Sequence, residues 1–356
     1  MRILFVGDVN PYSRSIQRLN AFKSLGYHVV SINIAEQGFT PGLSPKSPFI
    51  TRLFEKFGYP LDSLAVNKKL IEKSAHDFDV IWVEKAMMVL PSTVAKIKTL
   101  SNATLIFYSN DNLEKRHNQS RYMLKSLAKY DFVITINGYS EMFYKNLGVK
   151  NLIKIRRSHD KGFLEKKSTI RKNPRDAVFI GSFEASRFRV LEHLALNGIP
   201  ITVFGNGWPL SSNPLLTITR RPVYEEQFIE EVQNSKLVFN FLRKINDDTS
   251  TGRTFEIAAL GGFLFSEDSE PHRRYFEEGK EAVFFSCSDM SGTLEKCRSY
   301  LENRKKRTEI SRAGRQRCIV SEYDHEASLS GVLSLLNQWP DGEWAVNLDI
   351  PISAIL

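Results

Sequence analysis

Residues 237–265 decide the fold, and they read LVFNFLRKINDDTSTGRTFEIAALGGFLF. The first part, residues 237–242, is almost wholly apolar, which is typical of a buried strand. After a polar loop, a short helix is predicted over about residues 253–260. It ends at Gly261-Gly262, because glycine accepts the left-handed backbone of a helix C-terminus. Residues 263–265 are again apolar, so the stretch predicts strand, loop, helix and strand in succession.

The predicted helix begins where a strand ends, with Ser250 or Thr251 as its N-cap. Open α/β sheets bind ligands at this edge, and a helix N-terminus favours a phosphate group there. Arg253 would add a bidentate phosphate donor. Glu256, about one turn further on, would accept two sugar hydroxyls. The alternative interpretation is an ordinary crossover whose Arg and Glu are simply solvated.

Length and composition describe a globular protein. A chain of 356 residues is long enough for two domains, and its 42% hydrophobic and 25% charged residues are ordinary for a soluble protein. The three cysteines lack CxxC spacing, which indicates neither a disulfide framework nor a zinc site. The N-terminus predicts a strand instead of a signal peptide, and no run approaches the ~18 apolar residues of a transmembrane helix. We therefore expect a cytoplasmic protein.

The net charge of +9 is concentrated in one segment. Residues 150–175 hold ten Lys or Arg against two acidic residues, so ten minus two leaves +8 there. Such a run is usually a solvated surface. The functional alternatives are an anionic membrane face, to which the protein would bind peripherally, or a phosphate-bearing ligand. Nucleic acid is disfavoured as a partner, because the aromatic residues of a stacking platform are absent.

The first half of the chain alternates between strand and helix patterns, which predicts a parallel sheet covered on both faces. Strands are expected over residues 3–6, 29–33, 80–83, 104–108, 132–136 and 152–155, and helices over residues 14–25, 63–75, 92–100 and 140–147. Four prolines between residues 36 and 60 predict a long irregular connection. The loop after the first strand lacks GxGxxG, which disfavours a nicotinamide dehydrogenase.

A second alternation starts at residue 177. Strands are expected over residues 177–180, 201–204, 237–242, 263–265 and 282–285, and helices over residues 186–196, 225–234, 253–260, 291–303 and 309–323. The expected fold class is thus α/β, with two Rossmann-like domains facing a cleft. The predicted boundaries are an N-terminal domain over 1–160, a basic linker over 161–176, a C-terminal domain over 177–338 and a tail of unknown role over 339–356.

Several short motifs occur in a fixed order. They are Asp79-Val-Ile-Trp-Val-Glu-Lys85, Ser109-Asn-Asp111, Phe179-Ile-Gly-Ser182, Phe204-Gly-Asn-Gly-Trp208, Arg253-Thr-Phe-Glu-Ile-Ala-Ala-Leu-Gly-Gly262, Phe276-Glu-Glu-Gly-Lys-Glu281 and Arg312-Ala-Gly-Arg315. In this order they resemble GT-B glycosyltransferases of the "group 1" type over roughly residues 1–330. The resemblance is closest to the branch with spore-maturation proteins of the CgeB kind.

The resemblance implies a bacterial hexosyltransferase-like enzyme that moves a sugar from a nucleotide-diphosphate sugar without a bound metal. No cofactor is implied beyond this co-substrate. The C-terminal domain would bind the donor, and the N-terminal domain would bind the acceptor, which is a saccharide, a lipid-linked molecule or a protein. Developing charge on the leaving diphosphate is stabilised by cations and helix N–H groups, so the chemistry fits the residues.

Roles carried over from the resemblance fall into three sets. The catalytic set is Asp111, Arg187, Arg253 and Glu256. The donor-binding set is Gly181, Ser182, Gly205, Trp208, Tyr224, Asp247, Asp248, Thr249 and Thr254. The acceptor-side set is Gly7, Asp8, Asn110 and Asn118. Glu256 would hold the ribose and Tyr224 would stack on the base, with packing as the alternative for Tyr224. Asp111 would be a base or hydroxyl binder, with helix capping as its alternative.

The sequence departs from the family where the stereochemistry is decided. Retaining enzymes of the wider group often carry Glu-x7-Glu, but the first glutamate is missing here, where the sequence reads Asp247-Asp248-Thr249. Retention is preferred but inversion stays open. Arg187 has a solvated helix position as its alternative, and Arg189 on the same predicted helix is expected to be structural. Two other functions remain, a non-catalytic nucleotide-sugar binder and a peripheral membrane or nucleic-acid-binding protein using residues 150–175.

Overall fold

The computed structural model describes residues 1–36, 48–136, 141–336, 338–340 and 342–348. The chain forms two compact units. Unit 1 comprises Met1–Arg156 together with His325–Leu356, and unit 2 is the intervening Arg157–Asp324. These units differ from the expected domains, because residues 325–338 join the first unit and not the second. The expected cleft between two domains stays a prediction.

Within the described residues, unit 1 is built on a seven-stranded sheet in which every pair of neighbours is parallel. The spatial order is β2-β1-β3-β4-β5-β6-β13. The strands are β1 (Arg2–Gly7), β2 (His28–Asn33), β3 (Val80–Glu84), β4 (Thr104–Ser109), β5 (Phe132–Thr135), β6 (Leu152–Lys154) and β13 (Ala345–Asn347). The order reverses between β1 and β3, where a switch point for ligands is expected.

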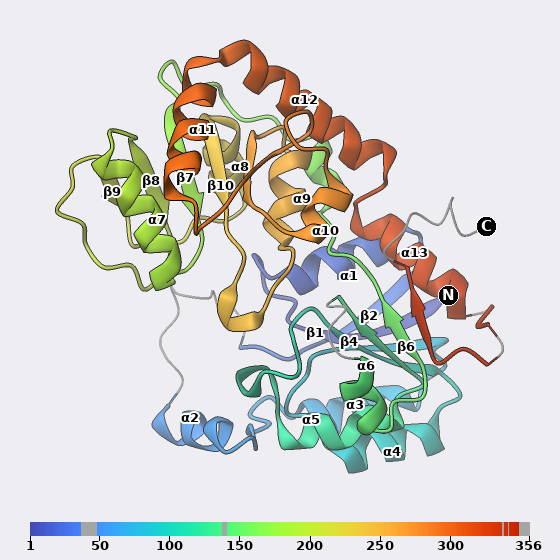
Figure 1. The fold of residues 1–356 in the computed structure, drawn as a ribbon. Helices are drawn as coiled ribbons and strands as arrows, with labels where there is room; N and C mark the ends of the chain where they lie inside the picture. The colour runs from blue at the N-terminus through green and yellow to red at the C-terminus, as the bar shows by residue number, and fades with distance from the viewer. Residues whose placement is uncertain (37–47, 137–140, 337, 341, 349–356) are drawn as a thin grey trace. The chain divides into compact units, whose positions relative to one another are not determined.

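Both faces of this sheet are covered by helices. Strand β1 shows the alternation, since Leu4 and Val6 belong to one apolar cluster and Ile3 and Phe5 to the other. Helices α3, α4 and α5 pack on the first face, and α1 and α13 lie side by side on the second (Figure 1). The helices are α1 (Arg14–Ser24), α2 (Phe49–Lys56), α3 (Val66–Ser74), α4 (Pro91–Leu100), α5 (Arg121–Ser126), α6 (Glu141–Asn146) and α13 (His325–Leu336). Two 3₁₀ turns, η1 (Arg116–Asn118) and η2 (Leu127–Lys129), flank α5.

One prediction for unit 1 needs correction. The connection expected to be irregular over residues 36–60 contains the helix α2, which starts directly after Pro48. A proline before the first helical turn interrupts no intrahelical hydrogen bond, so it does not prevent the helix. Pro41 and Pro45 lie outside the described residues. The tail is also structured in part, because β13 pairs with β6.

Unit 2 is built, over the part of the chain that is described, on a six-stranded parallel sheet. Its spatial order is β12-β11-β10-β7-β8-β9, so the first and fourth strands of the unit lie together at the centre, as in Rossmann folds. The strands are β7 (Arg175–Ile180), β8 (Ile201–Phe204), β9 (Leu216–Ile218), β10 (Ser235–Asn240), β11 (Leu264–Glu267) and β12 (Val283–Phe285). The expected α/β class with two parallel sheets is confirmed.

Helices again cover the sheet of unit 2 on both sides. Helices α7 and α11 share one apolar cluster with the sheet, and α8 and α9 share the other. The helices are α7 (Ala185–Leu196), α8 (Glu225–Gln233), α9 (Gly252–Ala259), α10 (Glu270–Tyr275), α11 (Met290–Glu302) and α12 (Arg304–Val320), with 3₁₀ turns η3 (Lys161–Leu164) and η4 (Lys244–Asn246). Helix α12 begins earlier than expected, because the Asn303 side chain caps it by accepting from the Lys306 amide.

Gly205 joins the ends of two neighbouring strands. Its φ is +153°, and a Cβ atom there would lie 1.9 Å from the Gly181 carbonyl oxygen. The same carbonyl accepts a hydrogen bond of 2.8 Å from the buried Trp208 indole. Gly205 and Trp208 therefore hold the end of β8 against the end of β7 by close packing. Their assignment to donor binding stays a prediction.

We predict that Gly205→Ala destabilises unit 2 by about 2–4 kcal/mol, because backbone atoms must move apart to admit the methyl group. Gly198→Ala is the matched control. Its φ is also positive, at +91°, but a Cβ there meets nothing within 4 Å. It should cost only about 1 kcal/mol, for the left-handed backbone alone. Denaturant unfolding measures both variants, and equal losses would contradict the close packing at Gly205.

Candidate functional site

The carboxyl ends of β7 and β10 form the switch point of unit 2. The two strands are parallel neighbours, so the loops that follow them emerge at the same edge of the sheet. From there the chain enters α7 on one face and α9 on the other. Such a divergence opens a crevice between the two loops, and ligands of open α/β sheets bind in it. The sequence prediction that the Arg187 and Arg253 loops share one edge is confirmed.

Arg187 spans this switch point. Its guanidinium donates to the Ser182 carbonyl at 2.9 Å and to the Leu242 carbonyl at 3.0 Å, which joins the loop after β7 to the loop after β10. It also pairs with Glu184 at 2.9 Å, and its side chain is only 5% exposed. Burial, with the nearby Arg243, lowers its pKa. The side chain is therefore a buried bridge, and it is not the solvated residue of the alternative interpretation.

Arg253 and Glu256 face each other on the first turn of α9. The Arg253 guanidinium donates to a Glu256 carboxylate oxygen at 2.6 Å and lies 3.7 Å from the centre of the Phe228 ring. The Arg253 side chain is 28% exposed, and that of Glu256 is 2% exposed. Tyr224, the N-cap residue of α8, is half-buried, and burial raises its pKa although the Arg253 charge opposes this. The cation is thus held in place while one side of it faces solvent.

Lys244 and Glu267 are two residues of this edge that the sequence analysis missed. Lys244 follows β10, and its ammonium pairs at 2.5 Å with Glu267, which ends β11. The other Glu267 oxygen accepts from the Leu242 amide at 2.9 Å. Burial opposes the charge on Lys244, but Glu267 outweighs it and raises the pKa of Lys244. The Lys244 side chain is 56% exposed. The available signal was a lysine in the polar loop that follows the apolar run over residues 237–242.

Three neighbouring residues assigned to the donor, Asp247, Asp248 and Thr249, differ in burial and in their contacts. Asp248 is buried and accepts from Arg157 at 2.9 Å and from Asn246 at 2.7 Å. Thr249 is exposed, and its carbonyl accepts from the Ser269 hydroxyl at 2.7 Å. Asp247 ends η4 in the left-handed conformation and is exposed. Of these three, Asp247 and Thr249 alone present their side chains at the surface.

Thr254 belongs to a buried polar network that fixes the start of α9. Its hydroxyl accepts from Asn240 at 3.0 Å and lies 2.9 Å from Nε2 of His272. The Thr251 hydroxyl donates to the other end of the Asn240 amide, and Ser266 accepts from the same amide. Nδ1 of His272 donates to the Glu267 carbonyl at 2.8 Å, so Nε2 is the acceptor for Thr254. The network joins α9 to β10, β11 and α10, and thereby positions Arg253.

Unit 1 has its own switch point, at the carboxyl ends of β1 and β3. Gly7 ends β1, where a Cβ would lie 2.4 Å from the Ser15 hydroxyl, so the start of α1 packs closely on it. Asp8 accepts from the amide and the side chain of Asn10, both at 3.0 Å. Glu84 ends β3 and forms two bonds to Arg18 at 2.5 and 2.6 Å, in a pair that is nearly fully buried.

Asp111 lies beside Lys85 at the same edge of unit 1. The Lys85 ammonium donates to Asp111 at 2.5 Å and to the Asn118 side-chain oxygen at 3.0 Å. Asn118 in turn donates to the Asn112 carbonyl at 2.9 Å. Both charged side chains remain about one fifth exposed, at 21% and 22%. Asp111 is therefore oriented by an ion pair, and Asn110 stands next to it in the loop after β4. Lys85 was missed, although it closes one of the quoted motifs.

Two features are absent from the described residues. No group of three or more His, Cys, Asp or Glu side chains in that part of the chain is arranged to hold a metal ion. None of its helices is both long and apolar enough to cross a membrane. The metal independence implied by the family resemblance stays a prediction.

We predict that acid weakens unit 2 through His272. Burial lowers the pKa of His272 from 6.5 to about 4. Between these values the unfolded chain binds a proton that the folded chain excludes, so the free energy of unfolding falls as the pH falls. From about pH 7 to about pH 5 this one group should cost roughly 2 kcal/mol. Denaturant unfolding of wild type and His272→Gln at both pH values tests this. The variant is expected to be weaker at neutral pH but to lose less on acidification, and equal losses would contradict the prediction.

Comparison with known proteins gives one family and many similar folds. Residues 187–333 match the family described as "Glycosyl transferase-like", a segment that starts at Arg187 and includes α9. A search of the curated proteins found no match to this sequence.

Solved structures resemble the chain over nearly its whole length. A sucrose-phosphate synthase from Thermosynechococcus elongatus has 11% identity and a TM-score of 0.64, covering 95% of this chain and 98% of that one. An alpha-glucosyltransferase bound to UDP and DNA has 13% identity and a TM-score of 0.68, covering 95% and 99%. Anabaena HepE bound to UDP has 13% identity and a TM-score of 0.63, covering 95% and 100%. The chain therefore shares the two-sheet α/β fold of these proteins, and its residues 187–333, which extend from unit 2 into α13, match a glycosyl transferase-like family.

Proposed function

We propose that the protein transfers a sugar from a nucleotide-diphosphate sugar to an acceptor, and that unit 2 binds the donor at its switch point. The observation that carries the proposal is the grouping of Arg187, Arg253 and Lys244 at the carboxyl edge of β7 and β10. Similar structures contain UDP or UDP-glucose, so a uridine diphosphate sugar is the first donor to test.

The Arg253–Glu256 pair fits a donor that carries both a phosphate and a ribose. A bound phosphate would take the exposed side of the Arg253 guanidinium, while ribose hydroxyls would donate to Glu256. Because Glu256 is almost fully buried, it needs its cation or such donors to remain compensated. The ion pair therefore holds the Arg253 guanidinium and the Glu256 carboxylate in position before the donor binds. As the diphosphate leaves, its growing charge interacts more strongly with Arg253 and Lys244, which lowers the barrier.

Metal independence and retention are part of the proposal. Side-chain cations at the switch point supply the positive charge that a leaving diphosphate needs. Retention follows from the family resemblance, although an aspartate, Asp248, stands where the first glutamate of the usual pair would be. The anomeric configuration of the product, followed by NMR, tests it.

Unit 1 is the proposed acceptor unit. Asp111 would accept a hydrogen bond from the attacking hydroxyl and orient it, while Lys85 and Asn118 hold the carboxylate and its cation in one orientation. In a retaining transfer the proton of that hydroxyl would pass to an oxygen of the leaving diphosphate. The acceptor class that we propose is a saccharide, a lipid-linked molecule or a protein.

We predict that Arg253→Ala weakens UDP binding by about tenfold or more, because a charge-assisted bond to phosphate is lost. Glu256→Gln should weaken it too, through the ribose. Arg187 is replaced by lysine, because alanine would leave a buried gap. Arg187→Lys keeps the charge but loses the forked guanidinium that joins the two loops, so it should also bind UDP more weakly. Arg189→Ala, an exposed arginine of α7, is the control and should bind like wild type. Calorimetric titration with UDP measures all five proteins. If the Arg253→Ala and Arg187→Lys proteins bind UDP like wild type, the switch point is not a diphosphate site.

We also predict that purified wild-type protein hydrolyses or transfers the sugar of UDP-glucose, and that Asp111→Asn lowers this turnover by about a hundredfold. The affinity for UDP should stay within about twofold, since UDP is assigned to unit 2. Asp77→Asn serves as the control, because Asp77 is exposed and lies before β3, at the amino edge of the sheet. UDP binding without any turnover in the wild type would identify a non-catalytic binder instead.

A further inference from the structure

A second cavity lies at the opposite edge of the unit 2 sheet. It has a volume of about 680 Å³. Pro174, Lys236 and Phe263 line it, and these residues lie at the amino ends of β7, β10 and β11. Helix α12 forms the other wall. The proposed donor site lies at the carboxyl ends of the same strands, so the two sites do not overlap.

The walls of this cavity carry positive charge in excess. It is lined by seven Lys or Arg residues and by no Asp or Glu. Some are neutralised nearby, as Lys236 is by Asp176 at 2.5 Å. Lys172, Arg304 and Arg312 have no acidic partner among the residues that the structure describes. Burial and the neighbouring Arg304 lower the pKa of Arg307, as expected where cations are crowded together.

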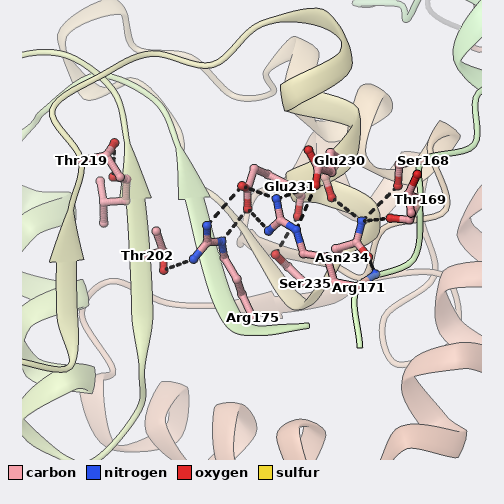
Figure 2. A network of polar contacts seen from close by, with 11 residues as sticks. Ser168, Thr169, Arg171, Arg175, Thr202, Thr219, Glu230, Glu231, Asn234 and Ser235 are labelled. Carbon is pink, nitrogen blue, oxygen red and sulfur yellow. Dashed lines mark hydrogen bonds and ion pairs between the residues drawn. The ribbon is translucent and has the colours of Figure 1, made fainter. Parts of the chain in front are cut away.

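One wall is held by a dense polar network (Figure 2). The Glu231 carboxylate lies between Arg171 at 2.9 Å and Arg175 at 2.6 Å, and its side chain is 7% exposed. Asn234 donates to Ser168 and Thr169 and accepts from the Arg171 amide at 2.6 Å. These contacts fix residues 168–175, the C-terminal part of the basic segment, against α8 and β10. The next side chain, Lys172, is left exposed at the cavity.

We propose that this cavity binds a phosphate-bearing anion at a site separate from the sugar donor. Guanidinium groups match phosphate oxygens bidentately, and Arg304 and Arg312 supply two such groups at one cavity. The phosphate belongs either to a free phosphorylated molecule or to a lipid head group. Ile170, which lines the cavity and is 89% exposed, would enter the bilayer interface in the second case. The site does not depend on the proposed transferase activity.

The test compares two double variants of α12. Arg304→Ala with Arg312→Ala removes two exposed cations that line the cavity. Lys305→Ala with Lys306→Ala removes the same charge from exposed positions of the same helix that do not line it. Both are made in an Arg253→Ala background, so that binding at the proposed donor site contributes less. Calorimetry with inorganic pyrophosphate and cosedimentation with vesicles of phosphatidylcholine, with or without one third phosphatidylglycerol, are the two measurements.

We expect the lysine double variant to bind like its parent and the arginine double variant to bind about tenfold more weakly or worse. Loss of pyrophosphate binding supports a free phosphate ligand. Loss confined to anionic vesicles, with Ile170→Ser also weaker, supports a lipid head group. The proposal is overturned if the parent binds neither probe, or if both double variants lose affinity equally, since that would be the effect of net charge alone. None of these results depends on whether UDP binds.

Discussion

The buried guanidinium of Arg187 is the contact on which the candidate donor site depends. It bonds to one carbonyl in the loop after β7 and to one in the loop after β10, at the only place in a doubly wound sheet where neighbouring loops turn to opposite faces. Without such a bridge the two loops would separate, because their helices pull away in different directions. A charged group with this degree of burial is costly, and the two carbonyls and Glu184 compensate it in part, since its Nε has no hydrogen-bond partner and its pKa is lowered.

Because the Arg187 guanidinium is buried, other cations at this edge must meet a ligand. Arg253 and Lys244 are the cations that reach solvent, and each is held by a carboxylate that is itself almost buried. The buried amide and hydroxyl network around Thr254 then fixes the direction of α9, so the exposed face of Arg253 has one orientation. In such an arrangement most polar residues of a binding segment support the few that can meet a ligand. In unit 1, likewise, Lys85 and Asn118 support Asp111, the residue proposed to meet the acceptor.

The alternation of strands and helices could be predicted from the sequence because it is a local pattern. The N-cap at Thr251 and the end of the helix at Gly261 could be predicted for the same reason. What the sequence analysis missed are contacts between residues that are distant in the chain. Lys244 meets Glu267, and Lys85 meets Asp111, only after the strands have aligned. Thr254 was assigned to the donor through the family resemblance, and its place in a buried polar network depends on tertiary packing that the sequence does not show. Helix α13 carries no sign of which sheet it will join.

The late position of α13 in the chain affects folding during translation. Unit 2 is continuous in sequence, whereas unit 1 is interrupted by it and completed by α13 and β13. On a ribosome, unit 2 has all its strands before α13 is translated, so it can fold while one apolar face of unit 1 still lacks its cover. The first segment must wait with Phe22 and Trp82 partly unprotected. A chaperone, or slow translation near residue 325, would matter most during that interval.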